Sequence, residues 1–194
     1  MALRLSKMGC RFFCRAIGIP LLFLGDYEMF VVLGLGSNRS YDSLSCVQLL
    51  SLAVEKLGGF VKDIKASSIY RTAAMYVTDQ DDFYNMVVSG EYEGSPHQLL
   101  ESIHVVESEL GRDRSKEIRN GPRSVDIDIE LFGKLNVNEN DLVIPHERMT
   151  ERAFVLKPLL EILGKDADKV GADISFFEEK LALLGDQRIE RISV

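Results

Sequence analysis

The segment from Arg119 to Ile129 carries the side chains whose types and spacing point most clearly to chemistry. A Gly-Pro turn brings Arg123 to the start of an expected strand, and Asp126 and Asp128 follow two residues apart. Because side chains alternate across a strand, both carboxylates should lie on one face and their apolar neighbours on the other. Two carboxylates this close repel each other unless a cation or a shared proton compensates. An ordinary solvent-facing strand edge contains the same residue types, but the preceding Gly-Pro-Arg favours a Mg²⁺ site with Arg123 as a phosphate partner.

The loop before this strand is rich in cations. Residues 111–120 contain Arg112, Arg114, Lys116 and Arg119. Charged loops of this kind are usually solvated and inert. Four cations leading into a two-Asp strand are also typical of a flexible lid that closes over phosphates, and both interpretations stay open.

A third group of candidate residues follows the strand. His146 lies on an expected turn, Arg152 lies in the next helix, and Phe154 comes two residues later. A lone His more often packs or faces solvent than takes part in catalysis. Here a helix start and a neighbouring Arg favour an anion pocket.

Aromatic and amide side chains gather in an expected strand–loop–strand unit. Phe83, Tyr84 and Asn85 follow the polar loop and lie beside its backbone. Stacking combined with a few amide hydrogen bonds is how proteins hold flat heterocycles. Aromatic rings in the core and an Asn that satisfies a turn would give the same pattern.

The glycine-rich segment Gly34-Leu35-Gly36-Ser37-Asn38 follows the first expected strand. It lacks the third glycine of a dinucleotide fingerprint and the Gly-Lys-Ser/Thr of a P-loop, so it predicts a structural turn. If the protein uses ATP, its phosphates must therefore be held by Arg, His and a metal ion.

The 194-residue chain has an acidic body and a basic beginning. Residues 1–25 hold four basic side chains and no acidic one, and since the whole chain carries −7, the rest carries −11. Broad nucleic-acid binding depends on Lys and Arg and is therefore not expected. Three cysteines form no disulfide or zinc pattern, which fits a reducing cytoplasm. The length suits one domain, and the sequence shows no obvious exposed apolar stripe, which favours a monomer.

Residues 1–28 are expected to lie outside the domain, which would span 29–194. The apolar run at 16–24 is too short to cross a membrane. Met29 directly precedes the first expected strand, which favours Met29 as the natural start. A targeting segment is the alternative.

Hydrophobic periodicity predicts the elements that position these residues. Strands are expected at 30–35, 64–70, 83–92 and 123–132. One helix should begin at Ser40 and another at Ser95-Pro96. A short helix from Thr150 should be interrupted by Pro158, and Asp173 should cap a final helix. The order β-α-β-β-α-β predicts an α+β, ferredoxin-like split-βαβ sandwich with an antiparallel sheet and two helices on one face.

Together these residues resemble the family of 6-hydroxymethyl-7,8-dihydropterin pyrophosphokinases. The shared motifs run in order from Phe30 to Ile162: Gly-Ser-Asn, Ser-x-Tyr-x-Thr, Gln-x-x-Phe-x-Asn, Gly-Arg, Gly-Pro-Arg-x-x-Asp-x-Asp and Pro-His-x-x-Met-x-x-Arg-x-Phe-x-Leu-x-Pro-Leu. The resemblance implies a ferredoxin-like fold and a folate-pathway transferase. Such an enzyme moves the β,γ-diphosphate of ATP to the hydroxymethyl oxygen of the pterin and releases AMP.

The resemblance also implies individual roles. Asp126 and Asp128 would bind two Mg²⁺ and, with Arg112 and Arg123, form the catalytic group. The expected ATP contacts are Glu107, Arg112, Lys116, Arg123, Ile129, His146 and Arg152. The pterin would lie between Phe83 and Phe154, and the expected pterin contacts are Thr72, Ala73, Met75, Phe83, Asn85 and Phe154.

Several positions depart from the pattern of the family, namely Ala73-Ala74, His104, Asn120 and Glu147. We expect these departures to change affinity more than chemistry. Two other functions remain open on the sequence: a noncatalytic ferredoxin-like binding module, and a metal-dependent phosphodiester hydrolase that uses the same Asp pair.

Overall fold

The computed structural model describes residues 28–75, 79–116 and 121–193. The extension predicted at 1–28 lies outside these ranges except for Glu28, which begins the first strand. Asn120 and part of the predicted lid also lie outside them.

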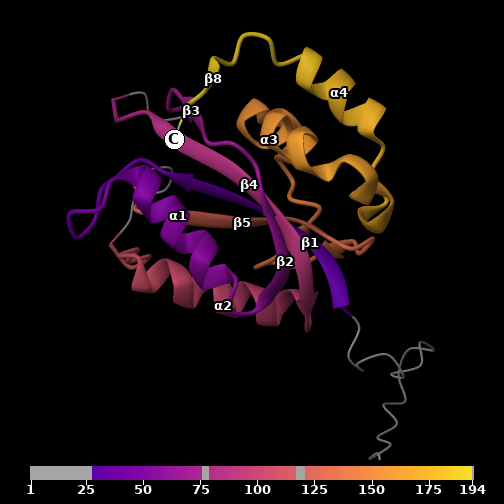
Figure 1. Cartoon of the computed structure of the whole chain (residues 1–194), viewed down its shortest axis with the longest axis horizontal. Helices are drawn as coiled ribbons and strands as arrows, with labels where there is room; N and C mark the ends of the chain where they lie inside the picture. Colours follow the sequence, from indigo (N-terminus) through magenta and orange to yellow (C-terminus); the bar gives the residue numbers. More distant parts are fainter. Residues whose placement is uncertain (1–27, 76–78, 117–120, 194) are drawn as a thin grey trace, which may run out of the picture.

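One six-stranded sheet forms the centre of the molecule (Figure 1). Its strands run in the order β5-β1-β4-β3-β8, and β2 also pairs with β4. All of these pairings are antiparallel. The strands are β1 (Glu28–Ser37), β2 (Val61–Ala66), β3 (Tyr70–Thr72), β4 (Phe83–Glu93), β5 (Asp126–Phe132) and β8 (Ile189–Arg191). Two short strands, β6 (Val137–Asn138) and β7 (Val143–Ile144), pair separately.

Helices cover both faces of the sheet (Figure 1). On one face lie α1 (Cys46–Leu57) and α2 (Pro96–Glu109), and on the other lie α3 (Ala153–Leu163) and α4 (Ile174–Ala182). Alternate residues of β1 enter the two cores, with Val31 and Leu33 facing α1 and α2 and Val32 facing α3. This arrangement confirms the predicted α+β, ferredoxin-like fold. No helix among the described residues is long and apolar enough to cross a membrane.

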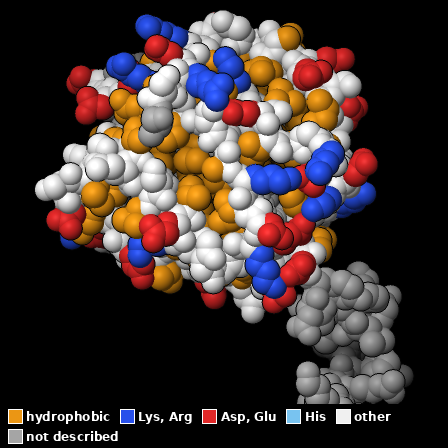
Figure 2. Space-filling view, in the orientation of Figure 1, with side chains coloured by type: hydrophobic (Ala, Val, Ile, Leu, Met, Phe, Trp, Pro, Cys, Tyr) orange, Lys and Arg blue, Asp and Glu red, His pale blue; other side chains and the backbone are white. Residues whose placement is uncertain are grey.

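On the face seen in Figure 2, apolar side chains lie near the middle, and most Lys, Arg, Asp and Glu side chains lie around them. The charged groups on this face therefore stay close to water, where their cost of desolvation is small.

The helix caps correct one prediction. Helix α1 begins after Ser45, whose side chain accepts a hydrogen bond from the Gln48 N–H while Gln48 bonds back to the Ser45 N–H. Ser40 was predicted to be this cap, but it precedes a tight turn in which Tyr41 and Leu44 bond to each other. The prediction missed the capping box Ser45-x-x-Gln48. Helix α2 begins after Ser95 with a second capping box, as expected from Ser95-Pro96.

Two predicted strands are shorter than expected. The strand expected at 64–70 is divided into β2 and β3. Between them the Ser67 N–H bonds to the Val87 carbonyl and its hydroxyl accepts from the Val87 N–H, which bends the chain. The last strand begins at Asp126 rather than Arg123. The backbone of Arg123 is instead bound to the turn at Asn38.

The prediction that Pro158 interrupts a helix was wrong, because α3 runs through it. A short 3₁₀ turn at Met149–Glu151 precedes α3, and the buried face of α3 carries Leu156, Leu159 and Leu163. Burial of this face outweighs the hydrogen bond that proline cannot donate. Asp173 caps α4 as predicted, whereas β8 was not foreseen.

Candidate active site

A cavity of about 100 Å³ lies between the sheet and the first turn of α3. Its floor includes bare backbone at Gly34 and Gly36, where a Cβ at Gly36 would come within 3.1 Å of the Asn85 Oδ1 atom. The sequence-predicted residues among its walls are Thr72, Ala73, Met75, Phe83, Asn85, Arg123, Asp126, Asp128, Arg152 and Phe154. The fold thus brings together residues from four separate stretches of the chain.

The two aspartates stand on the cavity side of β5, as the alternation predicted. Asp126 pairs with Gly36 of β1 and Asp128 with Gly34. Ile127 between them is buried in the core beneath α1 and α2. Both carboxylates therefore face the same space.

Asp126 is held by two arginines. Arg112 Nη1 and Arg123 Nη1 donate to its two carboxylate oxygens. Arg112 comes from the end of α2 and Arg123 from the turn before β5, so the carboxylate joins two segments. Charge-assisted bonds of this kind are the stronger class of protein hydrogen bond.

Asp128 has a cation and an imidazole as neighbours. Arg152 Nη1 lies 3.4 Å from its Oδ2 atom, and His146 Nε2 lies 4.0 Å from the same oxygen. Burial and the Arg152 charge lower the pKa of His146 to about 4, so the imidazole is neutral at pH 7. Because His146 is neutral, its contact with Asp128 is not an ion pair. His146 Nδ1 accepts from the Arg148 N–H, which leaves Nε2 as the donor toward the site.

The two carboxylates, Asp126 and Asp128, repel each other. Burial and the Asp126 carboxylate raise the pKa of Asp128. Because 38% of the Asp128 side chain is exposed, water reaches it and offsets part of the cost of burial. A divalent cation between the two groups would relieve this repulsion.

Glu107 connects the carboxylate pair to a second cavity. Its side chain is only 1% exposed, and it accepts from Arg112, from Arg114 and, at 2.8 Å, from the Ile127 N–H. Burial raises its pKa, while the two arginines act in the opposite direction. The second cavity is lined by Tyr41, His104, Glu107, Ser108, Gly111, Arg112, Asp113, Arg114, Ser115 and Lys116. Three predicted ATP contacts therefore line this space, on the other side of Asp126.

Two aromatic rings stand in the cavity wall with arginines beside them. The Arg123 guanidinium carbon lies 6.0 Å from the centre of the Phe83 ring, and that of Arg152 lies 5.7 Å from the centre of Phe154. Tyr84 was expected beside Phe83, but it packs against the core under α1 and α2. Neighbouring residues of β4 point to opposite faces, which excludes Tyr84 from the cavity.

Asn85 is buried and donates to the Thr72 hydroxyl at 2.9 Å. Asn38 ties the surrounding loops together, because it accepts from the Arg123 N–H at 2.8 Å and donates to Gln80 at 3.1 Å. The prediction of a structural turn at Gly34-Leu35-Gly36-Ser37-Asn38 was wrong for all but Asn38, because β1 continues through Ser37. Asn38, directly after the strand, fixes the position of Arg123.

Two predicted ATP contacts lie differently from the others. The Ile129 side chain is buried in the core on the opposite face from Asp128, so any ligand contact would come from its backbone. Lys116 is 82% exposed and pairs with Asp113 at 2.7 Å.

A family model agrees with the sequence motifs and the geometry. The model described as 7,8-dihydro-6-hydroxymethylpterin-pyrophosphokinase (HPPK) matches residues 32–164. The chain belongs to this family. The match confirms the resemblance, and it covers most of β1, the strands β2 to β7, and the helices α1, α2 and α3.

Relatives differ in how much of their length the chain covers. A 2-amino-4-hydroxy-6-hydroxymethyldihydropteridine pyrophosphokinase of Methylorubrum extorquens is 40% identical over 82% of this chain and 96% of its own length. The mitochondrial folate synthesis bifunctional protein of Arabidopsis thaliana is 41% identical over 71% of this chain, which spans only 24% of that protein. The chain therefore spans about a quarter of this longer relative.

The solved structures support the HPPK fold. A Plasmodium falciparum HPPK-DHPS structure superposes with a TM-score of 0.63 over 89% of this chain and 51% of that chain, at 16% identity. At this identity the likeness concerns the fold alone.

Sequence reasoning missed Glu130, which also lines the cavity. The alternation that placed Asp126 and Asp128 on one face extends to Glu130 and was the available signal. Burial and the Asp128 charge raise the pKa of Glu130 well above its usual range.

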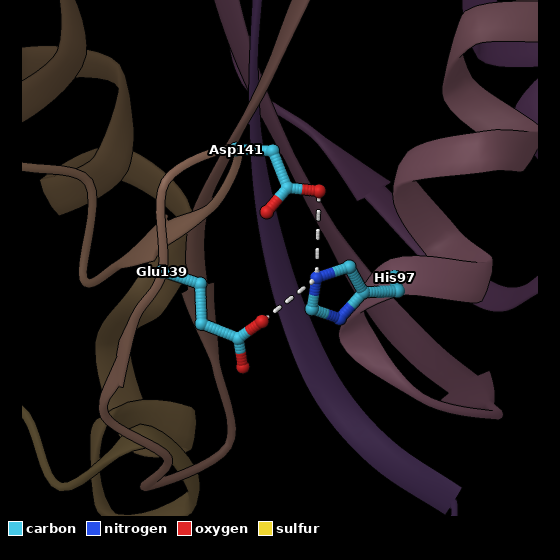
Figure 3. A group of neighbouring side chains, drawn as sticks. All are labelled: His97, Glu139 and Asp141. Atoms are coloured by element: carbon cyan, nitrogen blue, oxygen red, sulfur yellow. Dashed lines mark ion pairs between the residues drawn. The ribbon is translucent and has the colours of Figure 1, made fainter.

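One group of three potential metal ligands in the described residues lies outside both cavities. His97 Nε2 is 3.4 Å from Glu139 and 3.7 Å from Asp141 (Figure 3). All three are open to water, and none lines the cavity.

Proposed function

We propose that the chain transfers the diphosphate of ATP to 6-hydroxymethyl-7,8-dihydropterin, giving AMP and the pterin diphosphate for folate synthesis. The observation that carries this proposal is the pair Asp126 and Asp128, which lines the first cavity beside Arg123 and Arg152. Arg112, which binds Asp126, connects the pair to the second cavity. Family membership supports the same reaction.

The residues at this point fit two Mg²⁺ ions. Asp126 and Asp128 present carboxylate oxygens on one face. Burial and the Asp126 charge both raise the pKa of Asp128, and a cation would offset the second of these causes. Oxygen ligands together with substrate phosphates are the preferred environment of Mg²⁺. When bound, Mg²⁺ would neutralise phosphate charge and align the reacting oxygens.

The arginines and the neutral imidazole would hold the phosphates. Arg112 lines the second cavity, whereas Arg123 and Arg152 line the first, so together they span the path of a triphosphate. In this arrangement Arg112 and Arg123 exchange part of their pairing with Asp126 for phosphate oxygens. His146 Nε2 adds a donor without adding charge.

The first cavity would take the pterin. Phe83 and Phe154 offer ring surfaces, and Asn85, with the backbone from Thr72 to Met75, offers polar groups at the ring edge. In this orientation the hydroxymethyl group would point toward Asp126 and Asp128. Catalysis would then come from positioning and charge stabilisation rather than from an enzyme nucleophile.

Replacement of Asp128 by Ala tests the proposal. We expect AMP release in the presence of pterin to fall by at least about 10²-fold, more than for any single Arg replacement, because the metal loses a ligand. Asp186→Ala removes an exposed carboxylate that lines neither cavity and should leave the rate unchanged. A folded Asp128→Ala variant with normal activity would contradict the assignment.

A further inference from the structure

The carboxyl group of Glu130 is buried without a hydrogen bond in the part of the chain that the structure describes. The residue is 1% exposed, and neither side-chain oxygen has a hydrogen-bond partner among the described residues. Arg152, whose charge acts on it, forms its ion pair with Asp128. A buried polar group without a partner is costly, and such groups are rare in folded proteins. Each one therefore calls for a specific explanation.

Glu130 lies at a β-bulge of β5, on the same face as Asp126 and Asp128. Leu33 of β1 pairs with Ile129, and the next residue, Val32, pairs with Leu131, so Glu130 is the extra residue of β5. Bulges re-aim side chains and are common beside active sites. The backbone carbonyl of Glu130 accepts from the His146 N–H at 3.0 Å, so the main chain is satisfied while the side chain lines the cavity.

Gly34 provides the space that the carboxyl group occupies. A Cβ at Gly34 would lie 2.7 Å from the Glu130 Oε1 atom, closer than carbon and oxygen tolerate. A Cβ at Gly36 would likewise come close to a polar atom, at 3.1 Å from Asn85 Oδ1. Because the two glycines stand two residues apart, about 7 Å along β1, the floor carries one polar group near each of them.

The chemistry of a carboxyl group limits what can bind to it. In either protonation state a carboxyl group offers an acceptor oxygen, and in the protonated state it also donates one O–H. A flat heterocycle with N–H groups along its edge can therefore pair with both states, whereas an edge that carries only acceptor atoms can pair with the protonated state alone.

We propose that Glu130 is a substrate-contacting residue that determines specificity, with its carboxyl group bound to an N–H-bearing edge of the heterocycle over Gly34. The inference rests on the proposed function, since it takes the pterin as the occupant of this cavity. It assigns the edge near Gly34 to Glu130 and the edge near Gly36 to Asn85. No contact with the phosphates is involved.

The test compares Glu130→Leu with Glu130→Gln. Binding of 6-hydroxymethyl-7,8-dihydropterin is titrated with Mg²⁺ and saturating α,β-methylene-ATP, in which the bond to be broken is replaced. Glu130→Leu removes the acceptor and should bind the pterin at least tenfold more weakly. Glu130→Gln keeps an acceptor oxygen and should stay within about threefold of the wild type. The affinity of both variants for the ATP analogue should stay within twofold.

A second variant covers the case in which Glu130→Leu does not fold. Gly34→Ala leaves Glu130 in place but puts a methyl group where its carboxyl now lies, and it should weaken pterin binding several-fold with the affinity for the ATP analogue unchanged. Wild-type pterin affinity in folded Glu130→Leu would overturn the inference, and so would an equal loss of affinity for the ATP analogue. If the wild-type chain itself binds no pterin, the proposed function fails together with the inference. If the wild-type chain binds the pterin and Glu130→Leu binds it equally well, only the inference is refuted.

Discussion

Glu107 is the residue through which helix α2 reaches the carboxylate pair. Its buried carboxylate accepts from two arginines and from the backbone of β5, and one of those arginines, Arg112, also binds Asp126. A buried charge with several partners contributes more to position than to net stability, but removing it leaves its partners uncompensated. Individual side chains in this protein thus act as members of one charged network.

Glu107→Gln should therefore destabilise the fold and weaken nucleotide binding. We expect a loss of about 3 kcal/mol in the free energy of unfolding and a larger rise in the KM for ATP than in the KM for the pterin, because Arg112 is held less firmly. Denaturant unfolding and steady-state kinetics measure the two effects. The control is Glu109→Gln. Glu109 lies on the same helix as Glu107 but is exposed and pairs with Lys56 of α1, so this change should alter the free energy of unfolding by less than about 0.5 kcal/mol. Equal stability of the two variants would contradict the role of Glu107.

At the scale of elements, local patterns predicted most of the fold. The alternation of Asp126, Ile127 and Asp128 gave the correct face for each side chain, and Ser95-Pro96 gave the start of α2. Errors arose where tertiary contacts decide. Pro158 remains helical because α3 buries an apolar face against the sheet. The bulge at Glu130 depends on pairing with β1, which no local pattern of β5 shows.

The two candidate caps of α1 provide a test at this scale. Ser45→Ala should lower the free energy of unfolding by about 1 kcal/mol, because it removes the side-chain acceptor for the Gln48 N–H. Ser40→Ala changes the serine that the sequence suggested and should cost less than about 0.3 kcal/mol. Thermal or denaturant unfolding measures both. A larger effect at Ser40 than at Ser45 would show that α1 begins elsewhere in solution.

The whole molecule is a sheet with an apolar core on each face and the charged site at the beginning of β5. The first cavity opens on the α3 side, and the second lies at the end of α2. Asp126, bound by Arg112 and Arg123, stands between them. Because these charges are partly buried, the stability of the entire fold depends on pH.

His146 makes a definite contribution to that dependence. Its pKa falls from 6.5 to about 4 in the folded protein, so between these values the unfolded chain binds more protons. Stability from the neutral imidazole is complete above pH 6.5 and is lost as the pH falls toward 4. His146→Gln should reduce the loss of stability over this range by up to about 3 kcal/mol. Denaturant unfolding at a series of pH values measures this pH dependence in the wild type and in His146→Gln. Identical pH profiles of the two proteins would contradict a buried neutral His146.

The most direct test of the proposed reaction is the ratio of AMP formed to pterin consumed, measured with the full chain, ATP and Mg²⁺. Transfer of diphosphate between the two cavities predicts one AMP and one pterin diphosphate for each 6-hydroxymethyl-7,8-dihydropterin consumed, with little AMP when the pterin is left out. AMP formed at the same rate without pterin would show hydrolysis by the Asp pair. Pterin binding without any AMP would show a binding protein, and either result would contradict the proposed transfer.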